Sequence, residues 1–336
     1  PNVARAVTAR GGAGMMPGAG RGGPGMGDGG ERALLARLFA RAVAAAEPGA
    51  CLRGHLPERP RGRCVVVGAG KGAAEMARAF ERLWDGPLEG VVVTRRGQGV
   101  PCERIRVMEA AHPVPDEAGL AASAALMAAV RGLSADDLVV ALVCGGGSAL
   151  LPCPPGGLTL ADEAALNGAL LASGAPISVM NAIRRQVSGI KGGRLAAAAH
   201  PARVVTLVVS DVPGDDPAQV ASGPTVPSAG TRGEARALAG LWRIALPERG
   251  AAWLGGGEGL PPEPGEAAFA RDAVRVVASA RLSLEAAARA AEAEGVAAAI
   301  LSDALEGEAR EAGRVLAAIA REVALRDRPF RRPVVL

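Results

Sequence analysis

Two lysines stand out in this chain of 336 residues, because only two of its 38 Lys and Arg residues are lysines. Lys71 and Lys191 both lie beside glycines, in VVVGAGKGAAEMA and SGIKGGRLA. The ammonium group is a compact point charge on a flexible stem, so it enters a tight anion site more easily than a planar guanidinium does. The two positions therefore indicate phosphate chemistry, the alternative being that each lysine merely lies near a helix start.

Two glycine-rich turns follow apolar runs, GAGKG at residues 68–72 and GGGS at residues 145–148. Glycine lets the backbone approach a ligand closely, and a turn between a strand and a helix presents N–H groups to an anion. The alternative for the first turn is tight packing of a helix on a strand. The groups expected to bind nucleotide or substrate belong to Gly68, Gly70, Gly145, Gly146, Gly147 and Ser148. The pattern is not a nucleophile elbow, because Leu150 stands where G-x-S-x-G needs its last glycine.

Charged side chains in three further segments could complete such a site. Asp211 and Asp216 follow the apolar run VVTLVV, and one or two carboxylates are the protein ligands that Mg²⁺ typically uses with phosphates and water. An Asp-rich turn is the alternative. Arg184 and Lys191 could neutralise an anion. His112, in HPVPDE, could act as a base or bind substrate, although a lone histidine is more often structural.

The elements that must position these residues alternate along the chain. Apolar runs predict strands at 64–68, 90–94, 105–110, 138–144, 204–211 and 273–279, and helical spacing recurs between them, including 116–131, 160–173 and 177–199. Strands that are apolar on both faces are typical of a mostly parallel sheet with helices on both faces. We therefore expect a Rossmann-like α/β fold with its site at the carboxyl ends of the strands.

The order of these patterns also predicts domains. Residues 1–30 are Gly-rich and are expected to form a disordered tail. Residues 31–240 form the expected N-terminal Rossmann-like domain, and the Pro- and Gly-rich segment 226–268 contains the junction. Residues 270–336 are expected to begin a second α/β domain, which is incomplete because the chain stops where a strand starts.

Composition excludes several classes of function. Aromatic residues are 2% of the chain and the arginines are interspersed with acids, which argues against a nucleic-acid partner. No apolar stretch of 18 residues indicates a membrane span. The five cysteines form no CxxC pair and fit reduced thiols in a cytoplasmic protein. Whether the chain forms a homodimer stays open.

Taken together, these segments resemble the bacterial glycerate 2-kinase family, whose C-terminal module is often called MOFRL. The matching runs are VVGAGKGAAEMA, EAAHPVPDEAG, CGGGSALLPCP, MNAIRRQVSGIKGGRLA and LVVSDVPGDDPAQVASGPTVP. Their order and spacing agree from about residue 33 to residue 336.

The resemblance implies transfer of the γ-phosphoryl group of ATP to the 2-hydroxyl of D-glycerate with Mg²⁺, giving 2-phosphoglycerate. Lys71 matches the lysine implicated in catalysis in that family. The family pattern continues beyond the strand at Pro333 and supplies a second catalytic arginine there, for which this chain, ending at Leu336, has no counterpart. An inactive fragment is therefore one alternative to an active kinase.

Two other readings remain. A hydroxypyruvate reductase-like enzyme using NADH would place an acidic residue at the end of the second strand, but that strand ends in Thr94-Arg95-Arg96. Arg95 could instead suit the 2′-phosphate of NADPH. A ligand-binding protein without catalysis would retain the glycine turns and show no turnover.

Overall fold

A computed structural model describes residues 28–257 and 259–336, and it divides into two compact units. The larger unit spans Pro48–Val277, and the smaller joins the N-terminal residues up to Glu47 with Ala278–Leu336. Of the expected tail, residues 1–27 lie outside the described residues and residues 28–30 begin a helix. The domain boundaries expected from sequence stay a prediction.

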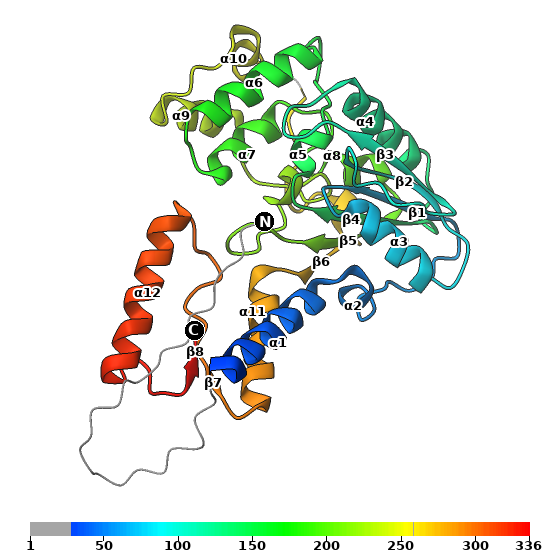
Figure 1. The fold of residues 1–336 in the computed structure, drawn as a ribbon. Coiled ribbons are helices and arrows are strands. Elements are labelled where there is room, and N and C mark those ends of the chain that lie inside the picture. The colour runs from blue at the N-terminus through cyan, green and yellow to red at the C-terminus, as the bar shows by residue number, and fades with distance from the viewer. Residues whose placement is uncertain (1–27, 258) are drawn as a thin grey trace, which may run out of the picture. The chain divides into compact units, whose positions relative to one another are not determined.

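The larger unit is built on a six-stranded sheet with the strand order β3-β2-β1-β4-β5-β6 (Figure 1). Its strands are β1 (Cys64–Ala69), β2 (Glu89–Arg95), β3 (Ile105–Ala110), β4 (Leu138–Cys144), β5 (Arg203–Val209) and β6 (Ala273–Ala278). Every neighbouring pair from β3 to β5 is parallel. The chain starts at β1, works outward to β3 and then returns to β4, so the direction of winding changes between β1 and β4. The predicted Rossmann-like fold is confirmed.

The strands are buried on both faces, which explains their continuous runs of valine and leucine. Val65 and Val139 belong to one core with α4 (Glu117–Val130) and α8 (Arg194–Ala199). The alternate residues Val66 and Val140 are equally buried. Since successive side chains on a strand point to opposite faces, helices must cover the sheet on both sides. The helix α3 (Ala73–Leu83) contacts β1, β2, β3 and β4.

A cluster of helices with its own small core follows β4. It contains α6 (Leu160–Ala172), α7 (Ile177–Gln186), α9 (Arg232–Leu241) and α10 (Glu248–Gly255). Thr159 and Thr231 begin α6 and α9 with capping boxes, in which the threonine and an acid three residues later bond each other's backbone. Leu166, Ile183 and Leu254 fill the core between the helices.

The helical pattern expected over residues 177–199 is interrupted in the structure. The segment forms α7 and α8 separated by a turn over residues 187–193. Gly192 and Gly193 have φ of +65° and +85°, a left-handed conformation that glycine adopts without steric cost. The turn therefore follows from the glycines, which outweigh the helical spacing on either side.

The smaller unit combines the N-terminal helix with the C-terminal elements. These are α1 (Asp28–Ala46), α11 (Ala280–Ala293), α12 (Ala309–Arg326) and the two-residue parallel strands β7 (Ala297–Ala298) and β8 (Val334–Val335). Leu34 and Leu38 of α1 pack with Ala291 of α11. The strand expected to open a second domain is β6, which instead joins the large sheet beside β5. No helix among the described residues is long and apolar enough to cross a membrane.

Candidate active site at the switch between β1 and β4

The two glycine turns meet where the strand order reverses. The turn after β1 and the turn after β4 are joined by a hydrogen bond from Lys71 N to Gly145 O of 2.9 Å. Gly72 N donates to Cys144 Sγ at 3.1 Å, and burial raises the pKa of that thiol to about 12, so it stays protonated. In open α/β sheets this switch point is where ligands bind, outside the carboxyl ends of the strands.

Glycine is required at two of the predicted positions by close packing of the backbone. A Cβ on Gly70, whose φ is +137°, would lie 2.4 Å from Cys144 O. A Cβ on Gly68 would lie 2.5 Å from Leu142 O. Gly68 is inside β1 rather than in the turn, so its role is to let neighbouring strands approach. Gly70 shapes the turn that carries Lys71.

Lys71 lies directly over the second glycine turn. A Cβ on Gly146 would come within 2.9 Å of Lys71 Cε and within 3.1 Å of His112 Nε2. Thr94 Oγ1 donates to Lys71 O at 3.0 Å and so holds the turn from the β2 side. Lys71 is exposed, and its ammonium group has no hydrogen bond or ion pair with any residue in the described part of the chain. A free cation therefore stands at the switch point.

His112 belongs to this cluster, although the sequence suggested a structural role for it. Burial lowers the pKa of His112, and the charges of Lys71 and Arg95 lower that pKa further, while Asp211 opposes them. Lys71 and His112 both lie close to Gly146, and the charges of Arg95 and Asp211 are near enough to act on the same imidazole. The ring is therefore neutral at pH 7 beside two cations. The sequence did carry a signal for this position of His112. The residue follows the strand β3, and the carboxyl ends of neighbouring parallel strands lie at the same edge of the sheet.

Of the two carboxylates predicted to bind metal, one faces the cluster. Asp211 is exposed, and its Oδ2 lies 2.0 Å from where a Cβ on Gly145 would be, so this carboxylate packs against the glycine turn. Asp216 Oδ1 instead accepts from Ala218 N at 3.0 Å, which closes its own turn. No group of three or more His, Cys, Asp or Glu side chains in residues 28–257 and 259–336 forms a metal cage. Asp211 alone fits Mg²⁺, which needs few protein ligands when phosphates and water supply the rest.

A chain of polar side chains leads from Ser148 into the interior. Ser148 Oγ lies 2.8 Å from Ser222 Oγ, and Ser222 Oγ lies 3.0 Å from Asn181 Oδ1. Arg184 Nη1 donates to the same Asn181 oxygen at 3.2 Å, and Arg184 Nε donates to Asn167 Oδ1 at 2.8 Å. Neither Ser222 nor Asn181 was among the site residues predicted from the sequence. Arg184 is thus held in place by two amides, behind the Ser148 hydroxyl.

Lys191, the second lysine, lies in the interior rather than in the cluster. Its Nζ donates to Leu151 O at 2.7 Å and forms an ion pair with Glu163 Oε1 at 2.8 Å. The side chains of Lys191 and Glu163 are only 1% and 5% exposed. The anion expected beside Lys191 is therefore the carboxylate of the chain's own Glu163.

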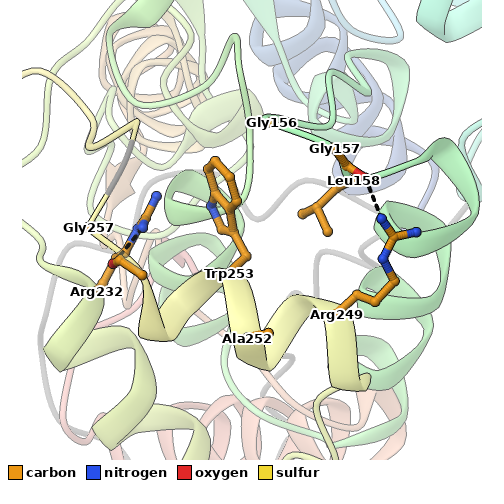
Figure 2. Close-up of a pocket in the computed structure, with 9 residues that line it drawn as sticks. Gly156, Gly157, Leu158, Arg232, Arg249, Ala252, Trp253 and Gly257 are labelled. Carbon is orange, nitrogen blue, oxygen red and sulfur yellow. Dashed lines mark hydrogen bonds between the residues drawn. The ribbon is translucent and has the colours of Figure 1, made fainter.

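A separate pocket of about 480 Å³ lies in the helical cluster (Figure 2). Arg232 lies over the Trp253 ring at 4.7 Å and donates to Gly256 O at 2.7 Å. Arg249 donates a hydrogen bond to Gly157 O, which is drawn as a dashed line in Figure 2. Arg249 also forms an ion pair with Asp162 at 2.9 Å. These arginines are bound by groups of the protein itself. None of the residues lining this pocket belongs to the cluster around Lys71.

Similar chains are found among known proteins. Residues 34–255 match the family model described as "Domain of unknown function (DUF4147)". A "Putative hydroxypyruvate reductase" of Agrobacterium vitis is 53% identical over 306 residues, covering 91% of this chain and 69% of that protein. The D-glycerate 2-kinase of Thermotoga maritima is 34% identical over 305 residues, covering 90% of this chain and 72% of that protein.

The crystal structure of a glycerate kinase from Thermotoga maritima has the same fold. It matches with a TM-score of 0.80 at 32% identity, over 90% of this chain and 72% of that chain. The chain belongs to the glycerate 2-kinase family. Within the family's fold, the glycine turns and Lys71 lie together at the strand switch point, where a ligand of an α/β sheet is bound.

Proposed function

We propose that this protein transfers the γ-phosphoryl group of ATP to the 2-hydroxyl of D-glycerate and so forms 2-phosphoglycerate. The observation that carries the proposal is the ammonium of Lys71, which has no partner among the described residues and lies by the two glycine turns at the switch between β1 and β4. Relatives over most of the chain are a glycerate kinase and a D-glycerate 2-kinase. Phosphoryl transfer depends on positioning and on charge stabilisation, which such a cluster provides.

Lys71 is proposed to stabilise the negative charge on the phosphoryl group during transfer. Its ammonium forms no ion pair with an acid among the described residues, so it is available to an incoming phosphate. Arg95 is exposed at the end of β2 and acts on the same imidazole, so it supplies a second positive charge nearby. The neutral ring of His112 is proposed to contact the substrate, as a hydrogen-bond partner or as a base.

Asp211 is proposed to bind Mg²⁺ together with the phosphates of ATP. A bound Mg²⁺ would neutralise phosphate charge in the transition state. Asp211 lies against Gly145, so a cation at its carboxylate is next to the backbone that approaches the ligand. Asp216 serves its own turn and is not needed for this role. A cytoplasmic location stays a prediction from the sequence, and whether the chain forms a homodimer stays open.

The reductase alternative meets an obstacle at β2. The strand ends at Arg95, with no carboxylate at the position that would bind the ribose of NAD. Incubation of the purified chain with D-glycerate, ATP and Mg²⁺, followed by ³¹P NMR, tests the two activities against each other. We expect 2-phosphoglycerate and ADP. Oxidation of NAD(P)H with hydroxypyruvate, in the absence of any phosphorylated product, would contradict the proposal.

A further inference from the structure

The hydrogen bonds behind Ser148 have only one consistent direction. The guanidinium group of Arg184 can only donate, so the Asn181 atom 3.2 Å from Arg184 Nη1 is the amide oxygen. The amide nitrogen of Asn181 correspondingly donates to Gln219 O at 2.9 Å. Both ends of this amide are therefore assigned by partners of fixed character.

This assignment determines where the two serine protons point. Ser222 Oγ lies 3.0 Å from Asn181 Oδ1, an oxygen that can only accept, so Ser222 donates its single proton there. Ser148 Oγ lies 2.8 Å from Ser222 Oγ, and the only remaining proton for that contact belongs to Ser148. Ser148 therefore donates inward and keeps only acceptor lone pairs for a ligand.

The loop around Ser222 is held in a costly conformation that maintains this arrangement. Ala221 and Ser222 have φ of +53° and +60°, although neither is a glycine. Residues other than glycine in this region cost free energy and cluster at functional sites. Gly192 N donates to Ser222 O at 3.1 Å, and the Ser222 side chain is fully buried. The surrounding structure thus fixes the Ser222 hydroxyl against Ser148.

We propose that Ser148 accepts a hydrogen bond from the substrate hydroxyl that is not phosphorylated, and so determines specificity for a three-carbon acid with two hydroxyl groups. The proposal rests on the proposed glycerate kinase function. The hydrogen-bonded chain from Ser148 through Ser222 and Asn181 ends at the Arg184 cation, which can only donate hydrogen bonds. Because no group in this chain can take up a proton, Ser148 cannot act as a base. It therefore suits a hydroxyl that keeps its proton, whereas the 2-hydroxyl loses its proton on transfer.

The location of Ser148 supports this assignment. Ser148 is partly exposed, and it is two residues from Gly146, on which Lys71 packs. No residue in the described part of the chain donates to Ser148 Oγ, so its lone pairs remain for a ligand. An anion such as carboxylate or phosphate would need a donor, which this hydroxyl no longer supplies. The backbone of the glycine turn and Lys71 remain for the anionic groups.

The test compares D-glycerate with D-lactate, which has the same carbon chain and 2-hydroxyl but lacks the 3-hydroxyl. Affinities of the full chain for both acids are measured by calorimetry, and kcat/KM for D-glycerate with Mg-ATP is measured in parallel. Ser148→Ala should weaken D-glycerate binding by about 10- to 100-fold, the usual effect of an unpaired hydrogen-bonding group. It should change D-lactate binding by less than about threefold, because D-lactate offers no hydroxyl to Ser148.

Two further variants distinguish the effect of the hydrogen bonds behind Ser148 from a general disturbance of the structure. Ser222→Ala frees the Ser148 proton to turn toward the ligand, so the preference for D-glycerate should fall by several-fold while urea unfolding confirms the fold. Ser178→Ala, an exposed serine on α7, should keep the preference.

Equal loss for both acids in Ser148→Ala, or no loss, would overturn the proposal, as would a wild-type protein that binds the two acids equally or binds neither. Binding with the expected preference but without phosphoryl transfer would instead contradict the kinase function and leave the role of Ser148 supported.

Discussion

At the residue level, the two lysines show that one side-chain type serves two purposes in this chain. Lys71 is exposed and without a partner among the described residues, and Lys191 is buried against Glu163. The sequence marked both, since each lies beside glycines, but it could not separate them. The partner of Lys191 is 28 residues away along the chain, and only the fold brings the two side chains together.

Replacing Lys191 is expected to affect stability. Lys191→Met leaves the Glu163 carboxylate buried without its cation, which typically costs about 3–5 kcal/mol. Urea unfolding should therefore show a large loss in Lys191→Met and partial recovery in the double variant with Glu163→Gln. Lys71→Met should stay within about 0.5 kcal/mol of wild type, because it breaks no such pair. Similar losses at both lysines would contradict the assignment.

The titration of His112 reports directly on the charge cluster. Lys71 lowers the pKa of His112, so Lys71→Ala should raise that pKa toward its ordinary value. Proton NMR can follow the change, since the chain has only three histidines. An unchanged pKa in Lys71→Ala would place the ammonium group away from the imidazole.

The lowered pKa of His112 also determines how the stability of the protein depends on pH. Because the pKa of His112 is lower in the folded state, the unfolded chain binds a proton first as the pH falls. The contribution of His112 to stability is therefore constant above about pH 6.5 and declines as the pH falls from there toward the lowered pKa. His112→Gln should reduce this decline.

At the level of elements, the strands and the glycine turns after β1 and β4 followed closely from the sequence, but the turn between α7 and α8 did not. The predicted strands at 105–110 and 138–144 coincide with β3 and β4, because buried parallel strands are uninterrupted apolar runs. The break between α7 and α8 was not predicted as a turn, because its glycines are interspersed with residues at helical spacing. Which strand ends converge depends on the strand order, and so spacing alone did not show that His112 and Lys71 both lie beside Gly146.

The glycine turn after β4 gives a prediction with a matched control. Gly146 and Gly157 have nearly equal φ, +83° and +81°, so alanine at either should cost about 1–2 kcal/mol of backbone strain. A Cβ at Gly146 would also press on Lys71 and His112, whereas nothing lies within 4 Å of a Cβ at Gly157. Gly146→Ala should therefore abolish most phosphoryl transfer, and Gly157→Ala should preserve it at temperatures where both variants are folded. Equal activity of the two variants would contradict the position of Lys71.

At the level of the whole molecule, the structure groups the first helix with the last elements. Sequence reasoning assigned residues from 31 onward to the N-terminal domain, since adjacent elements usually pack together. Leu34 and Leu38 of α1 nevertheless share a core with Ala291 of α11, which lies about 250 residues further along the chain. No local pattern in α1 identifies that partner.

This grouping predicts where a core mutation acts. Leu38 is 4% exposed in the smaller unit, and Leu142 is fully buried in the sheet of the larger unit. Each Leu→Ala substitution should cost about 2–5 kcal/mol. Hydrogen exchange should show Leu38→Ala reducing protection mainly in α1 and α11, and Leu142→Ala reducing it mainly in the large sheet. Loss of protection in the same segments for both variants would contradict the division into units.

Phosphoryl transfer is proposed to take place beside Lys71, and the rate of ADP release with D-glycerate and Mg-ATP in Lys71→Ala tests this location. We expect kcat to fall at least 100-fold in Lys71→Ala, because the variant loses a charge that stabilises the transition state. The midpoint of urea unfolding should be unchanged. Lys71→Arg should recover little, because the planar guanidinium does not replace a compact ammonium in a tight turn. A Lys71→Ala variant whose kcat stays within twofold of wild type would contradict the role of Lys71 in phosphoryl transfer.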